Sequence, residues 1–388
     1  MDVNKSISLL NNWILSSGIQ NINKSSSVNG GFNSWFSMDK KSYPFVYSEI
    51  TGYGITTLLF LDSMEKSSLY VEKAESAADW ILNKALHPCG GIKTRCYYSK
   101  NDENDGYSFE KGNIFAFDTA MVLFGLSGLY KKTKEEKYLR ASVKISDFLV
   151  SMQKDNGQFF AFYNPHTKDL GDINNKWSNQ SGAYHAKIAM GLLNSYDITK
   201  KEKYKESAIK VCGSSLAFQE KNGRFVTSTK DNSTLQHPHC YAAEGLLYAG
   251  LKLNIQEYIN SAIKAAEWSF NSQLENGGMP QIYDHNLNRF NKHERTDILS
   301  QVLRLGLLIN SCSNSEIINI KKLEKLKNRL LSFQNLNGQQ EGGIFYGFEH
   351  DGKEHKDLNA WCSMFALQAL SFFKLSKEKI RLSTDLLV

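Results

Sequence analysis

The sequence predicts an all-α fold, an (α/α)6 toroid, in which six helical hairpins form an inner and an outer ring of helices. Two observations predict it. The pattern Gln-x-x-Asn-Gly occurs four times in the chain, and each occurrence ends an apolar-periodic segment and precedes a second, more apolar one. Internal repeats are a better guide to domain organisation than chain length. We therefore assign residues 1–388 to a single toroid domain.

The first helix of each repeat is marked by a tyrosine and by a small residue four positions later. Apolar residues at steps of three and four predict one buried helical face, and the small residue lets a neighbouring helix approach. An earlier segment that starts at Tyr70 follows the same pattern but carries Ala85 in place of the glutamine. The other tyrosines each lie fifteen residues before a repeated glutamine, at Tyr138, Tyr204 and Tyr258.

Each first helix is expected to end at an Asn-Gly or Gly-Gly pair, because glycine reaches positive φ without steric cost. The glycines in question are Gly30, Gly90, Gly157, Gly223, Gly277 and Gly338. The repeated glutamine, one turn earlier, is expected to hydrogen-bond backbone groups at that helix end, which is a structural role. The same role is expected at all four positions, Gln153, Gln219, Gln273 and Gln334.

The second helix of each repeat is more apolar, and most of these helices carry Gly or Ala near the middle. Connections from a first to a second helix are long, as in residues 91–115 and 158–176, whereas the return connections are short. Long loops on a rigid scaffold usually form binding surfaces. We therefore expect a mouth lined by these loops and by the N-termini of the second helices. Those helices are expected at residues 49–65, 116–131, 181–197, 238–252, 296–310 and 358–374.

Composition excludes several classes of partner. Lys and Arg number 46 against 40 Asp and Glu, and this excess of 6 is spread without a basic block. Nucleic acid is therefore not an expected partner, although an acidic ligand is permitted. No apolar run is long enough to predict a membrane span, and the N-terminal segment lacks the pattern of a signal peptide. Six cysteines without a Cys-x-x-Cys pair indicate a reducing, cytoplasmic environment. No P-loop, dinucleotide or zinc pattern occurs, so we expect no cofactor and no metal.

The segment Phe148–Phe159 reads F-L-x-x-x-Q-x-x-x-G-x-F and resembles the repeated motif of α/α-toroid terpenoid cyclases. The phrases YSEITGYGITTLL, FDTAMVLFGLSGLY and LNAWCSMFALQAL make nearly the whole chain resemble six-hairpin glycosidase-like proteins of exopolysaccharide biosynthesis clusters. This second resemblance implies the toroid fold and, commonly, glycoside hydrolysis. The superfamily also includes polysaccharide lyases and sugar epimerases.

Two other toroid activities fit the sequence less well. A terpenoid cyclase needs an aspartate-rich D-x-D-D motif, which neither DENDG (Asp102–Gly106) nor DLGD (Asp169–Asp172) matches. A lanthionine cyclase needs cysteine and histidine zinc ligands in the mouth, and HPHC does not match that pattern. Carbohydrate chemistry is therefore the expected activity.

Three carboxylates are the candidate acid and base for such chemistry. Asp118, in NIFAFDTAMVLF, lies among phenylalanines, which raises the pKa of a carboxyl group and suits a general acid. Glu49 opens the first apolar helix and Asp357 precedes the last, and each is a candidate for the ionised partner. Each carboxylate also has a structural interpretation, as an N-cap for Asp118 and Asp357 and as a complement to the helix dipole for Glu49.

Three histidines stand at other helix starts. Pro238 begins its helix and is expected to present His237 to the mouth from the preceding loop. His239 and His185 are candidates for substrate binding and, equally, for packed side chains. Histidines two residues apart do not share a helix face, so His237 and His239 are not expected to bind zinc together.

An arginine and three aromatic residues complete the candidate substrate-binding site. Arg295 is expected either to clamp a carboxylate or phosphate, or to form an ion pair with Glu294 or Asp297. Aromatic rings stack on sugars, and the rings at these helix starts are those of Trp177, Tyr184 and Trp361.

This inventory supports two reaction classes. Glycoside hydrolysis needs a protonated acid and a base or nucleophile on either side of the bond, for which Asp118 and either Glu49 or Asp357 are the candidates. A lyase or epimerase acting on a uronate needs a histidine or tyrosine base, with His237 as the candidate, and a cation. A non-catalytic glycan-binding toroid is a third alternative. The expected partner in each case is a carbohydrate.

Overall fold

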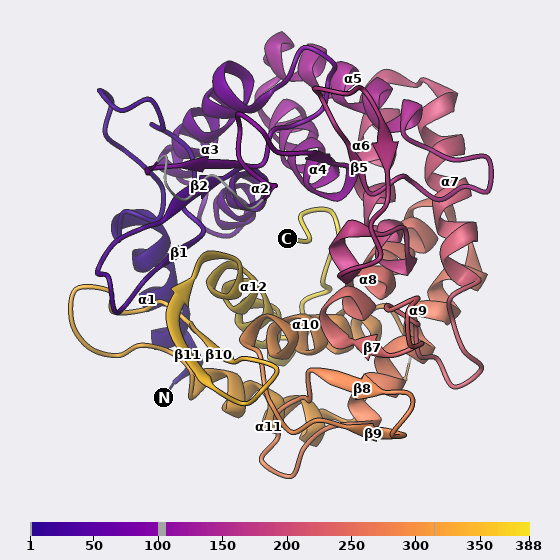
Figure 1. Ribbon diagram of the computed structural model, residues 1–388. Helices are drawn as coiled ribbons and strands as arrows, with labels where there is room; N and C mark the ends of the chain where they lie inside the picture. Colours follow the sequence, from indigo (N-terminus) through magenta and orange to yellow (C-terminus); the bar gives the residue numbers. More distant parts are fainter. Residues whose placement is uncertain (1, 100–105, 314) are drawn as a thin grey trace. The chain divides into compact units, whose positions relative to one another are not determined.

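The computed structural model describes residues 2–99, 106–313 and 315–388. It is predominantly helical (Figure 1). Part of the expected loop 91–115, including most of the DENDG motif, lies outside the described residues. The first helices of the repeats are α1 (Val3–Ser16), α3 (Ser68–Trp80), α5 (Glu136–Ser151), α7 (Glu202–Leu216), α9 (Gln256–Asn271) and α11 (Ile320–Leu331).

The second, apolar helices confirm the expected ranges to within a few residues. They are α2 (Ser48–Glu65), α4 (Ala116–Thr133), α6 (Ile188–Thr199), α8 (Gln236–Leu253), α10 (Thr296–Cys312) and α12 (Ala360–Lys377). The third was expected from residue 181, but a 3-10 helix (Ala183–Lys187) precedes α6 there. The return connections are short, and Lys66 and Ser67 alone separate α2 from α3.

Contacts divide the chain into two compact units, which we describe separately. Unit 1 comprises Met1–Ile19, Trp35–Ser42 and Phe218–Leu387, and unit 2 comprises Gln20–Ser34, Tyr43–Ala217 and Val388. In unit 2, α2, α4 and α6 pack side by side as one layer, and α3, α5 and α7 pack against them as a second. The single-domain assignment stays a prediction.

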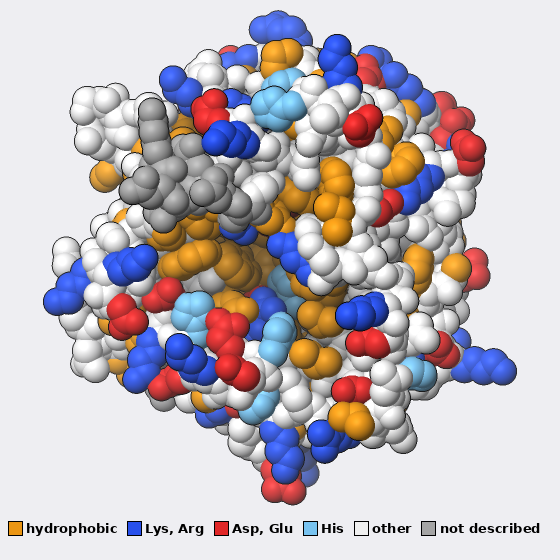
Figure 2. Space-filling view, viewed as in Figure 1, with side chains coloured by type: hydrophobic (Ala, Val, Ile, Leu, Met, Phe, Trp, Pro, Cys, Tyr) orange, Lys and Arg blue, Asp and Glu red, His pale blue; other side chains and the backbone are white. Residues whose placement is uncertain are grey.

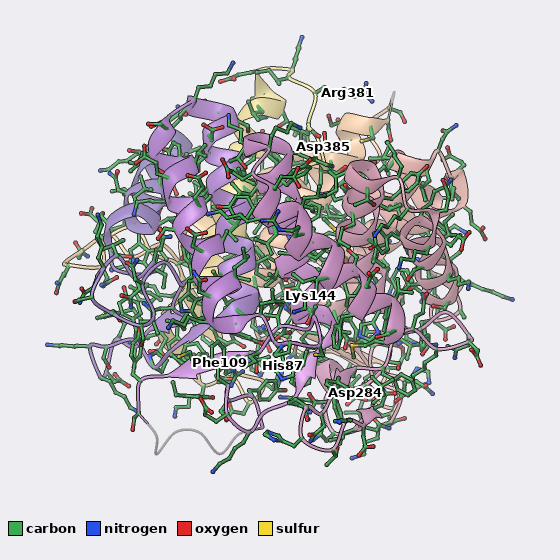
Figure 3. The ribbon with its side chains drawn as sticks, turned by 90° about the horizontal axis from the view of Figure 1, so that it is seen from above. His87, Phe109, Lys144, Asp284, Arg381 and Asp385 are labelled. Atoms are coloured by element: carbon green, nitrogen blue, oxygen red, sulfur yellow. The ribbon has the colours of Figure 1, made fainter. Side chains whose placement is uncertain are left out.

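Unit 1 repeats this two-layer arrangement. Helix α10 packs between α8 and α12, while α9, α11 and α1 form the second layer. The long connections and the short ones lie at opposite ends of these helices. Figure 3 shows this for unit 1, where Asp284, in a long connection, lies at one end and Arg381, after α12, lies at the other.

Short strands, which the sequence did not predict, occupy the long connections. In unit 2, β2 (Phe45–Tyr47) pairs with β3 (Arg95–Tyr97), and β4 (Ile114–Phe115), β5 (Phe162–Tyr163) and β6 (Leu170–Gly171) form a sheet. In unit 1, β7 (Thr234–Leu235), β8 (Ile282–Asp284) and β9 (Arg289–Phe290) form one sheet, and β1 (Trp35–Phe36), β10 (Phe345–Phe348) and β11 (Glu354–Asn359) another. These antiparallel ladders order the loops that precede the apolar helices.

The repeated glutamines hydrogen-bond backbone at helix ends, as predicted. The Gln153 amide nitrogen donates to the carbonyl of Gly157 at 2.9 Å, within its own turn, and to that of Ser207 in α7 at 3.0 Å. The same pair of bonds recurs at Gln219, with Gly223 and Ser261. Each glutamine therefore joins a turn to the next helix of the outer layer.

The glycine of the pattern packs against that same neighbouring helix. Gly157 has φ +88°, and a Cβ added to it would lie 2.6 Å from the carbonyl oxygen of Lys210 in α7. Glycine is thus required both by the backbone conformation and by the close approach of the helix. The repeated Gln-x-x-Asn-Gly phrase is therefore a docking element between consecutive outer helices.

Two members of this set differ from the sequence prediction. Gly338 has positive φ but open space around it. The Gln334 amide bonds instead to the carbonyl of Gly342, four residues after Gly338. Gly342, and not Gly338, is the glycine that packs on the next outer helix, at Leu9. The sequence pattern also missed Gln20, which bonds to Gly30 across a longer turn. In both turns, extra residues between the glutamine and the glycine break the Gln-x-x-Asn-Gly spacing, but the glutamine still hydrogen-bonds to the carbonyl of the glycine.

Charged side chains of both signs are interspersed over the face shown in Figure 2, in agreement with the small net charge of +6. Within the described part of the chain, no helix combines the length and the apolar composition that crossing a membrane requires.

Candidate active site

Unit 2 brings together two of the three candidate carboxylates. Glu49 lies in the first turn of α2 and Asp118 in the first turn of α4, and these helices pack side by side. Asp118 is 7% exposed. The N-cap of α4 is Phe115, so Asp118 does not cap its helix. Ser48 does not cap α2 either, because its hydroxyl donates to the carbonyl of Lys93.

Two tyrosine hydroxyls contact this carboxylate pair, and one of them connects its two members. Tyr47 hydrogen-bonds to both Glu49 and Asp118, and Tyr53, one helical turn into α2, also hydrogen-bonds to Glu49. The pairing of β2 with β3 places Tyr47 directly opposite Arg95, whose charge acts on both carboxylates. Tyr47, Tyr53 and Arg95 were not among the candidates, because no spacing rule joins β2 and β3 in the sequence.

Burial controls the protonation of the pair. Burial, followed by the charge of Asp118, raises the pKa of Glu49 to about 8. Burial also raises the pKa of Asp118 to about 6, against the opposing effects of the Tyr47 hydrogen bond, Arg95 and Lys176. At neutral pH the pair therefore holds about one proton, shared between the two carboxylates.

Aromatic rings and two cations surround the pair. The Arg95 guanidinium lies 4.3 Å from the ring centroid of Tyr107, and the Lys176 ammonium lies 4.2 Å from the same centroid. Tyr107 also stacks on Phe115, at 4.8 Å between centroids and 12° between planes. The site therefore combines a proton-sharing acid pair, positive charge and flat apolar surface.

Three further candidates lie together in unit 2, and the charge of Asp118 acts on one of them, Tyr184. Tyr184 is 2% exposed, contacts Phe117 and packs edge-on against Trp177, which is half-buried. His185 is completely buried between Tyr184 and Phe159, and burial lowers its pKa to about 3. Neither ring nitrogen of His185 has a hydrogen-bond partner among the described residues. His185 is thus a neutral, packed side chain, and Trp177 offers more surface to a ligand than Tyr184.

Unit 1 holds a second buried cluster, centred on Asp297 in the first turn of α10. The carboxylate is completely buried. Its Oδ2 accepts hydrogen bonds from the Arg295 guanidinium and, at 3.2 Å, from the indole nitrogen of Trp361. Burial is the largest single effect and opposes ionisation of Asp297, but the charges of Arg295 and His237 together with the hydrogen bonds from Trp361 and Arg295 outweigh it, and the pKa is lowered. Arg295 therefore forms the ion pair expected with Asp297, while Glu294 pairs with Arg329.

His237 completes this cluster. Its Nδ1 lies 2.7 Å from the side-chain oxygen of Gln301 and 3.3 Å from Oδ2 of Asp297. Its ring packs against Tyr241, with 4.4 Å between centroids. The His237 side chain is 7% exposed, so the cluster is almost closed to solvent.

His239, two residues after His237 in α8, has a structural role. Its Nδ1 accepts a hydrogen bond from the backbone of Phe225, and its Nε2 bonds to the carbonyl of Ala265. Burial lowers its pKa to about 4, so the ring is neutral. Because both nitrogens are engaged and the residue is completely buried, a packed role accounts for His239. The nearby Glu244 is likewise paired inside the unit, with Arg304 at 2.7 Å.

Asp357 was expected at a helix N-terminus, and this placement is wrong. It lies in β11, where its carboxylate bonds to His355 at 3.0 Å and accepts the backbone N–H of Met38 at 3.1 Å. The N-cap of α12 is Asn359, whose side chain accepts the N–H of Cys362 at 3.2 Å. The hairpin of β10 and β11 extends the chain up to residue 359, so the helix begins later than residue 358.

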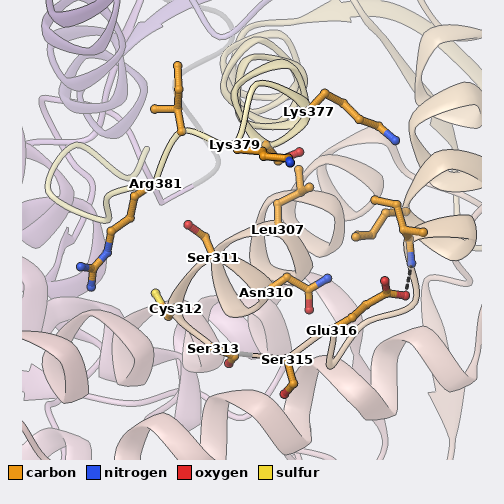
Figure 4. Close-up of a pocket in the computed structure, with 14 residues that line it drawn as sticks. Leu307, Asn310, Ser311, Cys312, Ser313, Ser315, Glu316, Lys377, Lys379 and Arg381 are labelled. Atoms are coloured by element: carbon orange, nitrogen blue, oxygen red, sulfur yellow. Dashed lines mark hydrogen bonds between the residues drawn. The ribbon is translucent and has the colours of Figure 1, made fainter.

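A cavity of about 660 Å³ in unit 1 contains none of the candidate residues (Figure 4). Its walls come from the C-terminal ends of α10 and α12, whereas Asp297 and Trp361 lie at the N-terminal ends of the same helices. Helix α10 is about 25 Å long at 1.5 Å per residue. The cavity is therefore separate from the titratable cluster.

The fold matches that of known carbohydrate enzymes. The chain superposes on cellobiose 2-epimerase from Bacillus thermoamylovorans with a TM-score of 0.74 and 12% identity, over 95% of this chain and 99% of that one. A sugar epimerase from a ruminal bacterium superposes with a TM-score of 0.74 and 10% identity, over 94% of this chain and 98% of that one. Unsaturated glucuronyl hydrolase from a Bacillus species superposes with a TM-score of 0.68 and 12% identity, over 95% of this chain and 97% of that one.

At this identity the likeness shows the fold alone. The chain has the (α/α)6 toroid fold, and the resemblance in fold to six-hairpin glycosidase-like proteins is confirmed. No family model matches the sequence, and no curated protein does. The activities named for these structures belong to those proteins.

Proposed function

We propose that the protein is a carbohydrate-active enzyme that hydrolyses a glycosidic bond with Glu49 and Asp118. The observation that carries this proposal is the placement of these two carboxylates in the first turns of the packed helices α2 and α4, where burial raises the pKa of both. Glycoside hydrolysis needs one carboxylic acid to protonate the leaving oxygen and one carboxylate as base or nucleophile. A pair whose environment separates its two pKa values supplies both states at once.

The electrostatics assign the roles within the pair. We assign the ionised state to Asp118, because the charge of Lys176 favours it there in addition to that of Arg95, and the role of proton donor to Glu49. Tyr47 holds both carboxylates through one hydroxyl, and Arg95 favours the charged form of each. After proton donation, Glu49 is the base that can accept a proton from the incoming water.

The substrate that this site favours is a saccharide, bound against aromatic rings. Trp177 is half-buried and keeps part of its ring open to a ligand, whereas the ring of Tyr107 is covered by Phe115 and by two cations, Arg95 and Lys176. Flat rings offer the apolar face that a sugar ring needs. The cations extend the substrate class to sugars that bear an acidic group.

A test is hydrolysis of a panel of neutral and uronic-acid oligosaccharides, followed by the appearance of new reducing ends. We expect Glu49→Gln and Asp118→Asn each to lower turnover by a hundredfold or more, since general acid–base catalysis contributes about 10²–10⁴. Glu65→Gln, at the other end of the same helix α2, is the matched control and should retain turnover. Turnover close to wild type in both site variants would remove the proposal.

A second candidate function rests on the cluster in unit 1. His237 with the buried cation Arg295 supplies the base and the positive charge that proton abstraction next to a carboxylate requires, as in a uronate lyase or a sugar epimerase. Product with ultraviolet absorbance from an unsaturated uronate, or an epimerised sugar, in place of new reducing ends would favour this candidate. This candidate would be established if His237→Ala lost that activity while Asp118→Asn retained it.

Binding without catalysis is the remaining alternative, and the same panel tests it. A glycan-binding protein would retain saccharides with no product of either kind. We also propose a cytoplasmic location, because all six cysteines are free thiols and a reducing compartment keeps them so.

A further inference from the structure

We propose that Asp297 is a positioning residue that holds His237 as its Nδ1-protonated tautomer, so that Nε2 is the proton-accepting nitrogen of the unit 1 cluster. This inference concerns unit 1 and does not rest on hydrolysis by Glu49 and Asp118. It assigns a role to Asp297, which sequence patterns treated only as an ion-pair partner of Arg295.

The first argument is the chemistry around Nδ1. This atom lies 2.7 Å from Oε1 of Gln301 and 3.3 Å from Oδ2 of Asp297. An ionised carboxylate only accepts hydrogen bonds, and an amide oxygen also accepts. A neutral imidazole carries its hydrogen on one nitrogen, so two acceptors at Nδ1 require the hydrogen to be there. The lone pair is then on Nε2.

The second argument is that Asp297 is fixed and charged. Oδ2 accepts hydrogen bonds from Arg295 and from Trp361, and Oδ1 accepts the backbone N–H of Ile298 at 2.8 Å. These donors come from the loop before α10, from α12 and from α10 itself. The carboxylate therefore cannot rotate away from His237 without losing several bonds inside a buried site.

The contrast with His239 shows that this tautomer is a property of the site. The backbone N–H of Phe225 donates to Nδ1 of His239, and Nε2 faces the carbonyl of Ala265. His239 is therefore held as the opposite tautomer, with hydrogen on Nε2. Two histidines on the same helix α8 thus have opposite tautomers, each set by its partners.

The arrangement provides a complete proton transfer. Nε2 of His237 accepts a proton from a ligand hydroxyl or from an acidic C–H, and the ligand keeps the electron pair of the broken bond. The ring becomes an imidazolium with hydrogen on both nitrogens. Its charge is stabilised by Asp297, which stays ionised throughout because Arg295 lowers its pKa. The ligand class is a hydroxyl-bearing molecule, in keeping with a saccharide.

The test is the nitrogen-15 spectrum of the histidine rings, recorded through long-range couplings to ring hydrogens at a pH where the rings are neutral. We expect His237 to show a protonated Nδ1 and an unprotonated Nε2, and His239 to show the reverse. This measurement uses the whole wild-type chain and needs no substrate. A His237 ring with hydrogen mainly on Nε2 would overturn the proposal.

Two variants separate Asp297 from Gln301 as the cause. In Asp297→Ala, only Gln301 faces Nδ1, and its amide, whose nitrogen has no hydrogen-bond partner among the described residues, can present either its oxygen or its nitrogen. The ring hydrogen should then no longer be confined to Nδ1. Gln301→Leu should leave the hydrogen on Nδ1, because Asp297 still accepts it. His239 should keep its tautomer in both variants and so reports that the fold is intact.

The opposite results contradict the assignment. A His237 tautomer unchanged in a folded Asp297→Ala protein would show that Asp297 does not set it. A tautomer reversed in Gln301→Leu would assign the role to Gln301 instead. If Asp297→Ala loses the native signals of His239, the spectra of wild type and Gln301→Leu decide alone.

Discussion

Glu49 and Asp118 are joined by the hydroxyl of Tyr47, which hydrogen-bonds to both carboxylates. The pair lies where the first turns of α2 and α4 meet, and Asp118 is buried there while Glu49 is half-buried. A single buried proton shared in this way links the chemistry of the site to the stability of the fold, and this link can be measured.

The first prediction concerns stability and pH. Burial raises the pKa of Glu49 from 4.5 to about 8 and that of Asp118 from 3.8 to about 6. Between these values the folded chain binds more protons than the unfolded chain, so the free energy of unfolding falls as pH rises. The loss is at most about 1.4 kcal/mol per pH unit for each proton. It is complete above about pH 8.

Glu49→Gln should reduce this loss, because glutamine has no proton to release. We expect denaturant midpoints at pH 5 and pH 8 to differ less in Glu49→Gln than in wild type. Asp118 should also lose part of its raised pKa when the neighbouring Glu49 charge is removed, which acts in the same direction, while titrating groups outside the pair are common to both proteins and cancel. Glu65→Gln should behave like wild type, and an equal pH dependence in wild type and Glu49→Gln would contradict the raised pKa.

The second prediction concerns the repeated glutamines. Gln219→Ala removes two hydrogen bonds to backbone carbonyls, those of Gly223 and Ser261. Each such bond contributes about 1 kcal/mol, so the melting temperature should fall while activity on a saccharide is retained. Gln339→Ala, at an exposed position of the same residue type, is the control. A stable Gln219→Ala protein without activity would mean that the glutamine has a catalytic role.

The third prediction compares two glycines with similar backbone conformation. Gly157 has φ +88° and a carbonyl 2.6 Å from the position of an added Cβ, whereas Gly338 has φ +78° and no neighbour within 4 Å. Gly338→Ala should lose only the conformational cost, about 1–2 kcal/mol. Gly157→Ala should lose more, because the turn must move away from α7. Equal denaturant midpoints for the two variants would show that close packing on α7 is unimportant.

The helices could be predicted from the sequence because their signals are local. Apolar periodicity and the Gln-x-x-Asn-Gly phrase gave the second helices to within a few residues. The ends of the short connections were harder to predict. Lys66, Lys134 and Lys200 adopt left-handed φ at the helix ends, a conformation usually taken by Gly or Asn. All three lysines are exposed, and each places its positive charge at the negative end of a helix dipole.

The candidate sites could be predicted in part. Glu49 and Asp118 were identified from their places at helix starts, but Tyr47 and Arg95 reach them through the pairing of β2 with β3, far apart in the sequence. Asp357 was misplaced because its strand and its bond to His355 leave no periodic signal. Residues that act through non-local strand pairing escape reasoning that rests on helical spacing.

The last prediction separates the two tyrosines of unit 2. The Tyr47 hydroxyl has a hydrogen bond with each carboxylate that lowers its pKa, and a hydrogen bond with Tyr53 lowers the pKa of Glu49. Removing the hydroxyl in Tyr47→Phe should therefore raise both values. In a profile of turnover against pH, the acidic limb reports the ionised partner Asp118 and the basic limb reports the proton donor Glu49. Both limbs should move to higher pH in Tyr47→Phe.

Tyr53→Phe is the matched variant, since it removes one hydroxyl from the same carboxylate and leaves Tyr47 in place. Its basic limb should move to higher pH, while its acidic limb should move less than in Tyr47→Phe. The direction follows because a hydrogen bond to a carboxylate stabilises its charged form, and its loss favours the proton. If the acidic limb of Tyr47→Phe stays at its wild-type position, the hydroxyl of Tyr47 does not couple Asp118 to Glu49 during turnover. Roles for the two carboxylates would then have to be assigned without a shared hydrogen bond.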